Sequence, residues 1–194
     1  MKLEELLTAA RSEFSSGSYE EARRKYVEAS KIAEKENDKR MLCIILGETG
    51  LTLSKLGKVR EALNANEHAY KIAVEEKLKY SQAALLSNIG LNHAEQGMLE
   101  MAMSYYNRSL PLFKEMKHHS ALAWTKYLIA SAAIDLGNQA TAIDALLESI
   151  AAYRKIGNEE KEKMAVKKLA NAYFDSDVET LTDMHIHQEA GLCW

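Results

Sequence analysis

The residues best suited to chemistry lie near the end of the sequence, where Asp183, His185 and His187 form a D-x-H-x-H run. Carboxylate and imidazole groups are common zinc ligands. On a helix, however, side chains two positions apart point to different sides, and no further His or Cys cluster completes a shell of ligands. We therefore expect no metal site and interpret the run as part of a tail.

The other reactive side chains are scattered along the sequence. His93 lies on the apolar face of an expected helix and is predicted to be a hydrogen-bonded core residue, whereas His118 and His119 fall in a turn. Cys43 and Cys193 belong to no CxxC pair, so both are expected to stay thiols. The sequence contains no glycine-rich phosphate loop after a strand and no nucleophile elbow. These features predict a protein that is not an enzyme and uses no cofactor.

The bulk composition favours an all-α protein. Alanine, leucine, glutamate and lysine dominate, and the 194 residues include nine glycines and one proline. The net charge of -3 provides no positive field to attract nucleic acid or an anionic bilayer. Charges interrupt the apolar run at residues 1–14, which indicates an amphipathic helix and not a signal peptide or membrane anchor. We expect a cytoplasmic protein that binds neither nucleic acid nor membrane.

A regular repeat organises the chain, and three kinds of position define it. Glycine occurs at an expected turn, alanine follows it, and a small residue precedes it. These positions are Gly17, Gly57, Gly97 and Gly137; Ala22, Ala62, Ala102 and Ala142; and Ala10, Gly50, Gly90, Ala130 and Ala170. Glycine permits the left-handed conformation that reverses the chain, and small residues let paired helices approach closely. The spacing predicts antiparallel helical hairpins over residues 2–36, 40–77, 80–118 and 120–156.

This pattern resembles the tetratricopeptide repeat, in the lengthened form of kinesin light chains and bacterial peptide-sensing regulators. In that form the first helix often reads Leu-x-Asn-Leu-Gly, which Leu86, Asn88 and Gly90 match. The period here is about 40 residues against the family's usual period of about 34, so the helices should be longer. The resemblance implies an all-α, right-handed superhelical solenoid of four full repeats.

The repeat pattern weakens at the end of the chain. A fifth unit begins with Ala165 and Leu169 on one face, but Asp177 stands where glycine is expected and Thr182 where alanine is expected. A terminal unit must present a polar outer face because nothing stacks on it. We predict a solenoid domain over residues 1–174, followed at 175–194 by a degenerate cap helix or a flexible tail.

The resemblance implies a groove lined by the first helix of each hairpin, which commonly binds a protein or peptide. The candidate residues for this groove are Leu51, Asn88, Leu91, Trp124, Tyr127, Ser131, Lys167 and Asn171, and Arg11, Phe14 and Glu48 are expected on the same face. An amide among large aromatic rings suits an extended or helical peptide. Trp124 and Tyr127 could equally fill the seam between hairpins, because aromatic residues at helical spacing are often core residues.

Two other features bear on binding. Chaperone-binding repeats clamp a terminal carboxylate, and the matching positions here are Gly47, Leu51, Asn88, Trp124 and Leu128. Only the asparagine agrees, so a receptor for chaperone tails is disfavoured. The basic residues Lys161, Lys163, Lys167 and Lys168 alternate with Glu159, Glu160 and Glu162. This alternation indicates a solvated helix face.

The sequence therefore predicts a non-catalytic adaptor that binds a peptide segment of a partner protein in its groove. Two alternatives stay open. The chain could be a peptide-sensing regulatory module that acts on a separate effector. It could also be a structural protein that forms homo-oligomers through the apolar ends of its solenoid.

Overall fold

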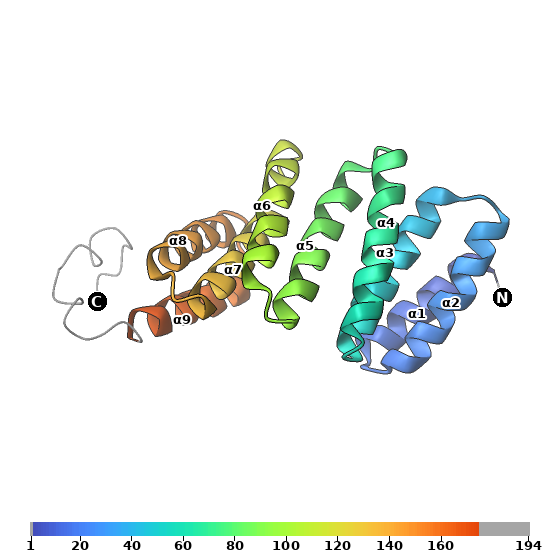
Figure 1. The fold of residues 1–194 in the computed structure, drawn as a ribbon, viewed down its shortest axis with the longest axis horizontal. Helices are drawn as coiled ribbons and strands as arrows, with labels where there is room; N and C mark the ends of the chain where they lie inside the picture. The colour runs from blue at the N-terminus through green and yellow to red at the C-terminus, as the bar shows by residue number, and fades with distance from the viewer. Residues whose placement is uncertain (1, 175–194) are drawn as a thin grey trace. The chain divides into compact units, whose positions relative to one another are not determined.

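The computed structural model describes residues 2–174, and every element in this range is an α-helix (Figure 1). The helices are α1 (Leu3–Ser15), α2 (Tyr19–Lys35), α3 (Lys39–Lys55), α4 (Val59–Glu75), α5 (Lys79–Glu95), α6 (Leu99–Glu115), α7 (His119–Asp135), α8 (Gln139–Lys155) and α9 (Glu159–Phe174). The predicted all-α fold of sequential hairpins is confirmed. The predicted cap or tail at 175–194, with its D-x-H-x-H run, lies outside the described residues.

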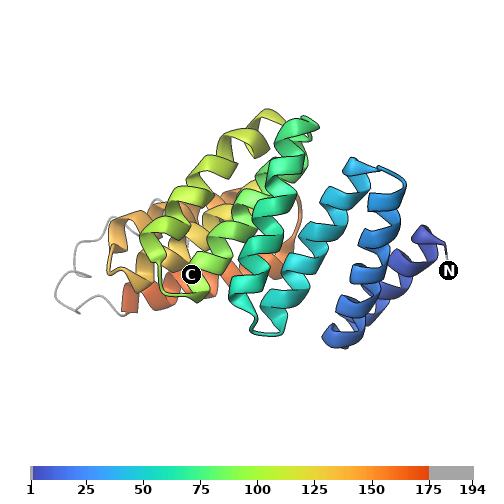
Figure 2. The ribbon, with the colours of Figure 1, turned by 45° about the vertical axis from the view of Figure 1, so that its right-hand side comes forward.

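The chain divides into two compact units, which are described separately. The first ends at Leu112 and the second begins at Phe113, so the division falls within α6. In the first unit, each of the helices from α1 to α4 packs against the next one in sequence, and α3 also contacts α5. Figure 2 shows the antiparallel course of these neighbours.

The chain turns twice in each repeat, at equal intervals. A residue with positive φ stands at each turn, namely Gly17, Asn37, Gly57, Lys77, Gly97, Lys117, Gly137 and Gly157. The residue after it donates its N–H to a carbonyl five positions earlier, as from Lys58 to Leu53 at 2.9 Å and from Leu78 to Ala73 at 2.8 Å. This is the Schellman arrangement that ends helices. Each full repeat is therefore two helices separated by turns of the same form.

Lys77 and Lys117 adopt a backbone conformation that glycine adopts more easily, with φ of 55° and 53°. The left-handed region costs a non-glycine residue about 1–2 kcal/mol. Glycine avoids this cost but raises the conformational entropy of the unfolded chain, which offsets part of the gain in stability. We expect Lys77→Gly to raise the free energy of unfolding by about 0.5–1 kcal/mol. Urea denaturation measures this change. Lys71→Gly, at an exposed position inside α4, is the control and should lose about 1 kcal/mol. A loss of stability in Lys77→Gly would contradict the turn geometry.

The small residues of the repeat mark close approaches between paired helices in the first unit. A Cβ atom added to Gly50 would lie 2.3 Å from Oδ1 of Asn66, and one added to Gly90 would lie 2.6 Å from the ring of Tyr106. Asn66 and Tyr106 are equivalent positions of successive repeats, on the second helices α4 and α6, and both are buried. The expected close approach is therefore present at both glycines.

A row of buried amides crosses the core of the first unit. Nδ2 of Asn66 donates to Oδ1 of Asn92 at 2.8 Å, and Nδ2 of Asn92 donates to Oγ of Ser54 at 2.5 Å. The two asparagines are 0% and 1% exposed. Oδ1 of Asn66 accepts no hydrogen bond. The row links α4 to α5 and α5 to α3, at the cost of one unsatisfied buried acceptor.

His93 differs in part from its prediction as a hydrogen-bonded core residue. The side chain is buried, with 5% of its surface exposed. Its ring stacks on Tyr105 with centroids 5.2 Å apart, but Nδ1 has no hydrogen-bond partner. The prediction is therefore correct for burial and wrong for this atom, because the contact that holds the ring in place is aromatic.

The second unit consists of the end of α6 with α7, α8 and α9. Helix α8 packs against both α7 and α9. Oγ of Ser149 donates to the carbonyl of Ala123 at 2.8 Å, which ties α8 to α7. The side-chain amide of Gln139 donates to the carbonyl of Ala172, which ties α8 to α9. The first helix of the fifth repeat is therefore held against the fourth hairpin.

Candidate functional site

The predicted groove residues all lie on the first helices of their hairpins, and none of their side chains is buried. In the first unit, Leu51 lies on α3, and Asn88 and Leu91 lie on α5. In the second unit, Trp124, Tyr127 and Ser131 lie on α7, and Lys167 and Asn171 lie on α9. Leu51, Leu91, Ser131 and Asn171 are equivalent positions of successive repeats. Their role as groove residues stays a prediction.

In the first unit, several residues expected on this face line one small cavity of about 220 Å³. Its lining consists of Arg11, Phe14, Ser15, Tyr26, Glu48 and Leu51, from α1, α2 and α3. The walls are largely hydrocarbon, and the lining includes one ion pair. Asn88 and Leu91 are not among its lining residues.

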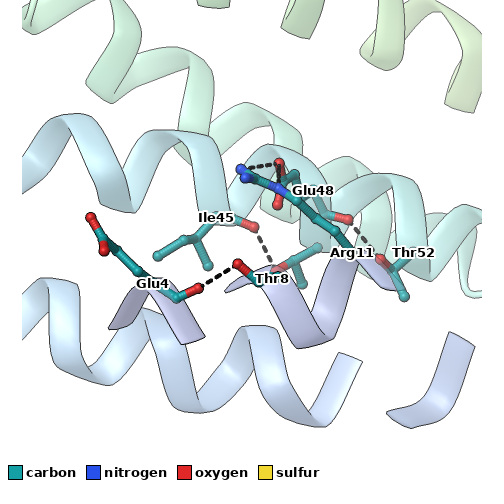
Figure 3. Close-up of polar contacts among 7 residues, drawn as sticks. Glu4, Thr8, Arg11, Ile45, Glu48 and Thr52 are labelled. Atoms are coloured by element: carbon teal, nitrogen blue, oxygen red, sulfur yellow. Dashed lines mark hydrogen bonds and ion pairs between the residues drawn. The ribbon is translucent and has the colours of Figure 1, made fainter. Parts of the chain in front are cut away.

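The ion pair at this cavity joins α1 to α3. The guanidinium of Arg11 contacts Oε1 of Glu48 at 2.7 Å, and Figure 3 shows the arginine reaching across to it. The hydrogen bond to Glu48 raises the pKa of the Arg11 guanidinium above its ordinary value, although burial opposes the shift. Arg11 is half exposed, so water screens the pair and it contributes about 0–1 kcal/mol. The pair is part of the cavity lining and provides little stability.

In the second unit, Trp124 and Tyr127 form a stacked pair one turn apart on α7. Their ring centroids lie 5.4 Å apart, with an angle of 12° between the ring planes. Trp124 is 37% exposed, whereas Tyr127 is partly buried. The two rings therefore pack against each other, and the ring of Trp124 is still exposed to solvent.

Two lysines of α9 lie over these rings. Nζ of Lys161 lies 5.4 Å from the ring centroid of Trp124 and 5.9 Å from that of Tyr153, and Nζ of Lys168 lies 5.1 Å from the ring of Tyr127. Such cation–π contacts contribute about 0.5–1 kcal/mol at exposed sites. The sequence interpretation of this lysine cluster as a solvated face is wrong for these two residues, because α9 packs close enough to α7 for their ammonium groups to reach the rings.

The tyrosines of this cluster do not act as acids or bases at neutral pH. Burial raises the pKa of Tyr153 to about 12, with a smaller contribution from Tyr127, and burial also raises the pKa of Tyr127. Both hydroxyls therefore stay protonated, and that of Tyr153 is buried with no hydrogen-bond partner. We name Trp124, Tyr127, Lys161 and Lys168 together the aromatic–lysine surface.

Within residues 2–174, no three His, Cys, Asp or Glu side chains gather in a way that could hold a metal ion. None of the helices in the described part of the chain combines the length and the apolar character needed to cross a bilayer.

Residues 81–155 match the family model of the tetratricopeptide repeat. No curated protein sequence matches the chain. Among solved structures, the apo form of RapI has a TM-score of 0.82 and 18% identity, over 92% of this chain and 65% of that one. The Rap conjugation gene regulator of plasmid pLS20, in complex with the Phr* peptide, has a TM-score of 0.80 and 17% identity, over 91% of this chain and 48% of that one.

A third structure comes from Podosopora anserina and has nearly identical repeats of kinesin light chain type. Its TM-score is 0.64 at 14% identity, over 88% of this chain and 93% of that one. The chain thus spans about half to two thirds of the two Rap proteins and nearly all of the Podosopora protein. At these sequence identities, the similarity to the three structures shows a shared fold and nothing more. The sequence match over residues 81–155 and the shared arrangement of helices agree with the spacing of the repeat, so the chain is similar to tetratricopeptide repeat proteins in this segment of its sequence and in its fold.

Proposed function

We propose that the protein is a non-catalytic adaptor that binds a peptide segment of a partner protein. The observation that carries the proposal is the stacked pair on α7, in which Trp124 remains 37% exposed. Tryptophan and tyrosine dominate binding energy at protein interfaces because they bury a large rigid surface at a small cost in side-chain entropy. A tryptophan already fixed by its neighbour loses little further entropy when a partner covers it.

The family supports this proposal, since tetratricopeptide repeats generally bind proteins or peptides. One protein of similar fold, the Rap regulator of plasmid pLS20, has been solved with the Phr* peptide. The same likeness favours a second candidate function, a peptide-sensing module whose output passes to a separate effector. In both cases the first event is peptide binding, so one experiment tests it for both.

A peptide-display selection on the immobilised full-length chain is the direct test. Selected peptides are labelled, and their affinity is measured by fluorescence anisotropy for the wild type and for Trp124→Ala. We expect the substitution to weaken binding by roughly 30-fold, because a central aromatic anchor contributes about 2 kcal/mol.

The matched control is Val74→Ala on α4, which removes a side chain that is 48% exposed in the first unit. It should leave the affinity within about twofold of the wild type, since surface substitutions away from the site have small effects. Equal affinities for the wild type and Trp124→Ala, in a variant that keeps its helical circular dichroism, would show that the stacked pair is not the site.

A further inference from the structure

We propose that the peptide bound by the aromatic–lysine surface is acidic, and that two of its carboxylates bind the ammonium groups of Lys161 and Lys168. This inference rests on the proposed function and specifies its ligand. The exposed ring of Trp124 provides the apolar part of the surface, and the two lysines border the rings on the side of α9.

The lysines are available because their present partners are aromatic rings. Within residues 2–174, neither Lys161 nor Lys168 forms an ion pair with a carboxylate. A charge-assisted hydrogen bond to a carboxylate is stronger than a cation–π contact. A carboxylate of the bound peptide can therefore replace the aromatic ring as the partner of each ammonium group.

Neighbouring basic residues of the second unit differ in this respect. Lys126 pairs with Glu148 at 2.8 Å, Arg154 with Glu162 at 2.9 Å, and Lys163 with Glu159 at 3.8 Å. These pairs neutralise much of the charge around the surface. Within the described part of the chain, Lys161 and Lys168 are the basic residues at the rings that have no acidic partner.

The spacing of the lysines predicts the spacing of the carboxylates. Lys161 and Lys168 are seven positions apart on α9, which places them about 10 Å apart along the helix axis. A peptide in the polyproline II conformation has three residues per turn and rises about 3.1 Å per residue, so acidic residues three positions apart lie on the same side of it and span about 9 Å. Such a peptide has apolar residues between its acids, which can contact Trp124.

The test uses short labelled probe peptides and the full-length chain. The acidic probe contains two glutamates three positions apart among leucines and serines, and the matched probe carries glutamine in their place. We expect the acidic probe to bind about tenfold more tightly, because each glutamate adds an ion pair at the edge of the site. Raising the salt concentration should weaken only the acidic probe, since screening acts on charges.

Variants of the chain assign the effect to the two lysines. In Lys161→Gln/Lys168→Gln the acidic and matched probes should bind equally, whereas Lys163→Gln, which removes the lysine paired with Glu159, should keep the preference. Equal binding of both probes to the wild type, or no binding of the acidic probe at millimolar concentration, would overturn the acidic ligand.

The two proposals fail in different ways. If both probes bind the wild type equally and Trp124→Ala weakens both, the site is correct and its acidic preference is wrong. If Trp124→Ala leaves the binding of both probes unchanged, the peptide site itself is wrong.

Discussion

Replacing Gly90 with alanine is expected to lower the free energy of unfolding by about 2 kcal/mol. The new Cβ would lie 2.6 Å and 2.7 Å from two ring atoms of Tyr106 and 3.0 Å from the carbonyl oxygen of Ala102. Overpacking of this kind costs about 1–3 kcal/mol, and more where backbone is involved. The gain in helix propensity from glycine to alanine, about 1 kcal/mol, offsets only part of this cost.

Gly47→Ala in α3 is the matched control. Its new Cβ would lie 3.2 Å from Cδ2 of Leu85, the far end of a flexible side chain. We expect this variant to be neutral or more stable by up to about 1 kcal/mol, because leucine can rotate away and the helix gains propensity. Chemical denaturation of both variants measures the difference. Equal effects of the two substitutions would contradict the close packing of α5 on α6.

Replacing Asn92 with leucine is expected to lower the free energy of unfolding by about 3 kcal/mol. Its amide accepts from Asn66 and donates to Ser54 inside the core of the first unit. The substitution leaves Nδ2 of Asn66 buried without an acceptor, and Oδ1 of Asn66 has no partner even in the wild type. An unsatisfied buried polar group costs about 1–3 kcal/mol, and here both ends of one amide would be unsatisfied.

Adding Asn66→Leu to that variant should restore most of the lost stability. The double variant replaces the unsatisfied amide with hydrocarbon, and the equivalent position of the fourth hairpin already holds a buried leucine, Leu146. A double-mutant cycle measures the coupling free energy of the pair. If the double variant is as unstable as the sum of the single variants, the hydrogen bond between the two amides does not hold them in the core.

The period of the repeat was predictable because glycine and alanine mark half of its turns and close contacts. The turns between hairpins were predicted only as breaks between helices, and their left-handed form was not predicted, since Asn37, Lys77 and Lys117 take the positive φ that Gly157 takes in the fourth repeat. A side chain other than glycine gives little sign of a left-handed backbone. Only the hydrogen bonds of the turns show that all of them have the same form.

The candidate site was predictable in part. Trp124 and Tyr127 were identified from their position in the repeat, but their stacking depends on rotamers that spacing does not determine. Lys161 and Lys168 were missed because glutamates alternate with the lysines around them. A signal was present: the two lysines flank the buried stripe of Ala165 and Leu169 at helical spacing, on the side of α9 that packs inward. Their contact with α7 depends on tertiary packing.

The emission of Trp124 tests the central claim, that this surface binds a peptide, most directly. The sequence contains two tryptophans, so Trp194→Phe leaves Trp124 as the sole source of tryptophan fluorescence. Our account predicts that a peptide selected on the chain changes this emission in a saturable way, with half the change at the concentration that gives half-maximal anisotropy. A peptide that saturates the protein by anisotropy and leaves the emission of Trp124 unchanged would contradict it.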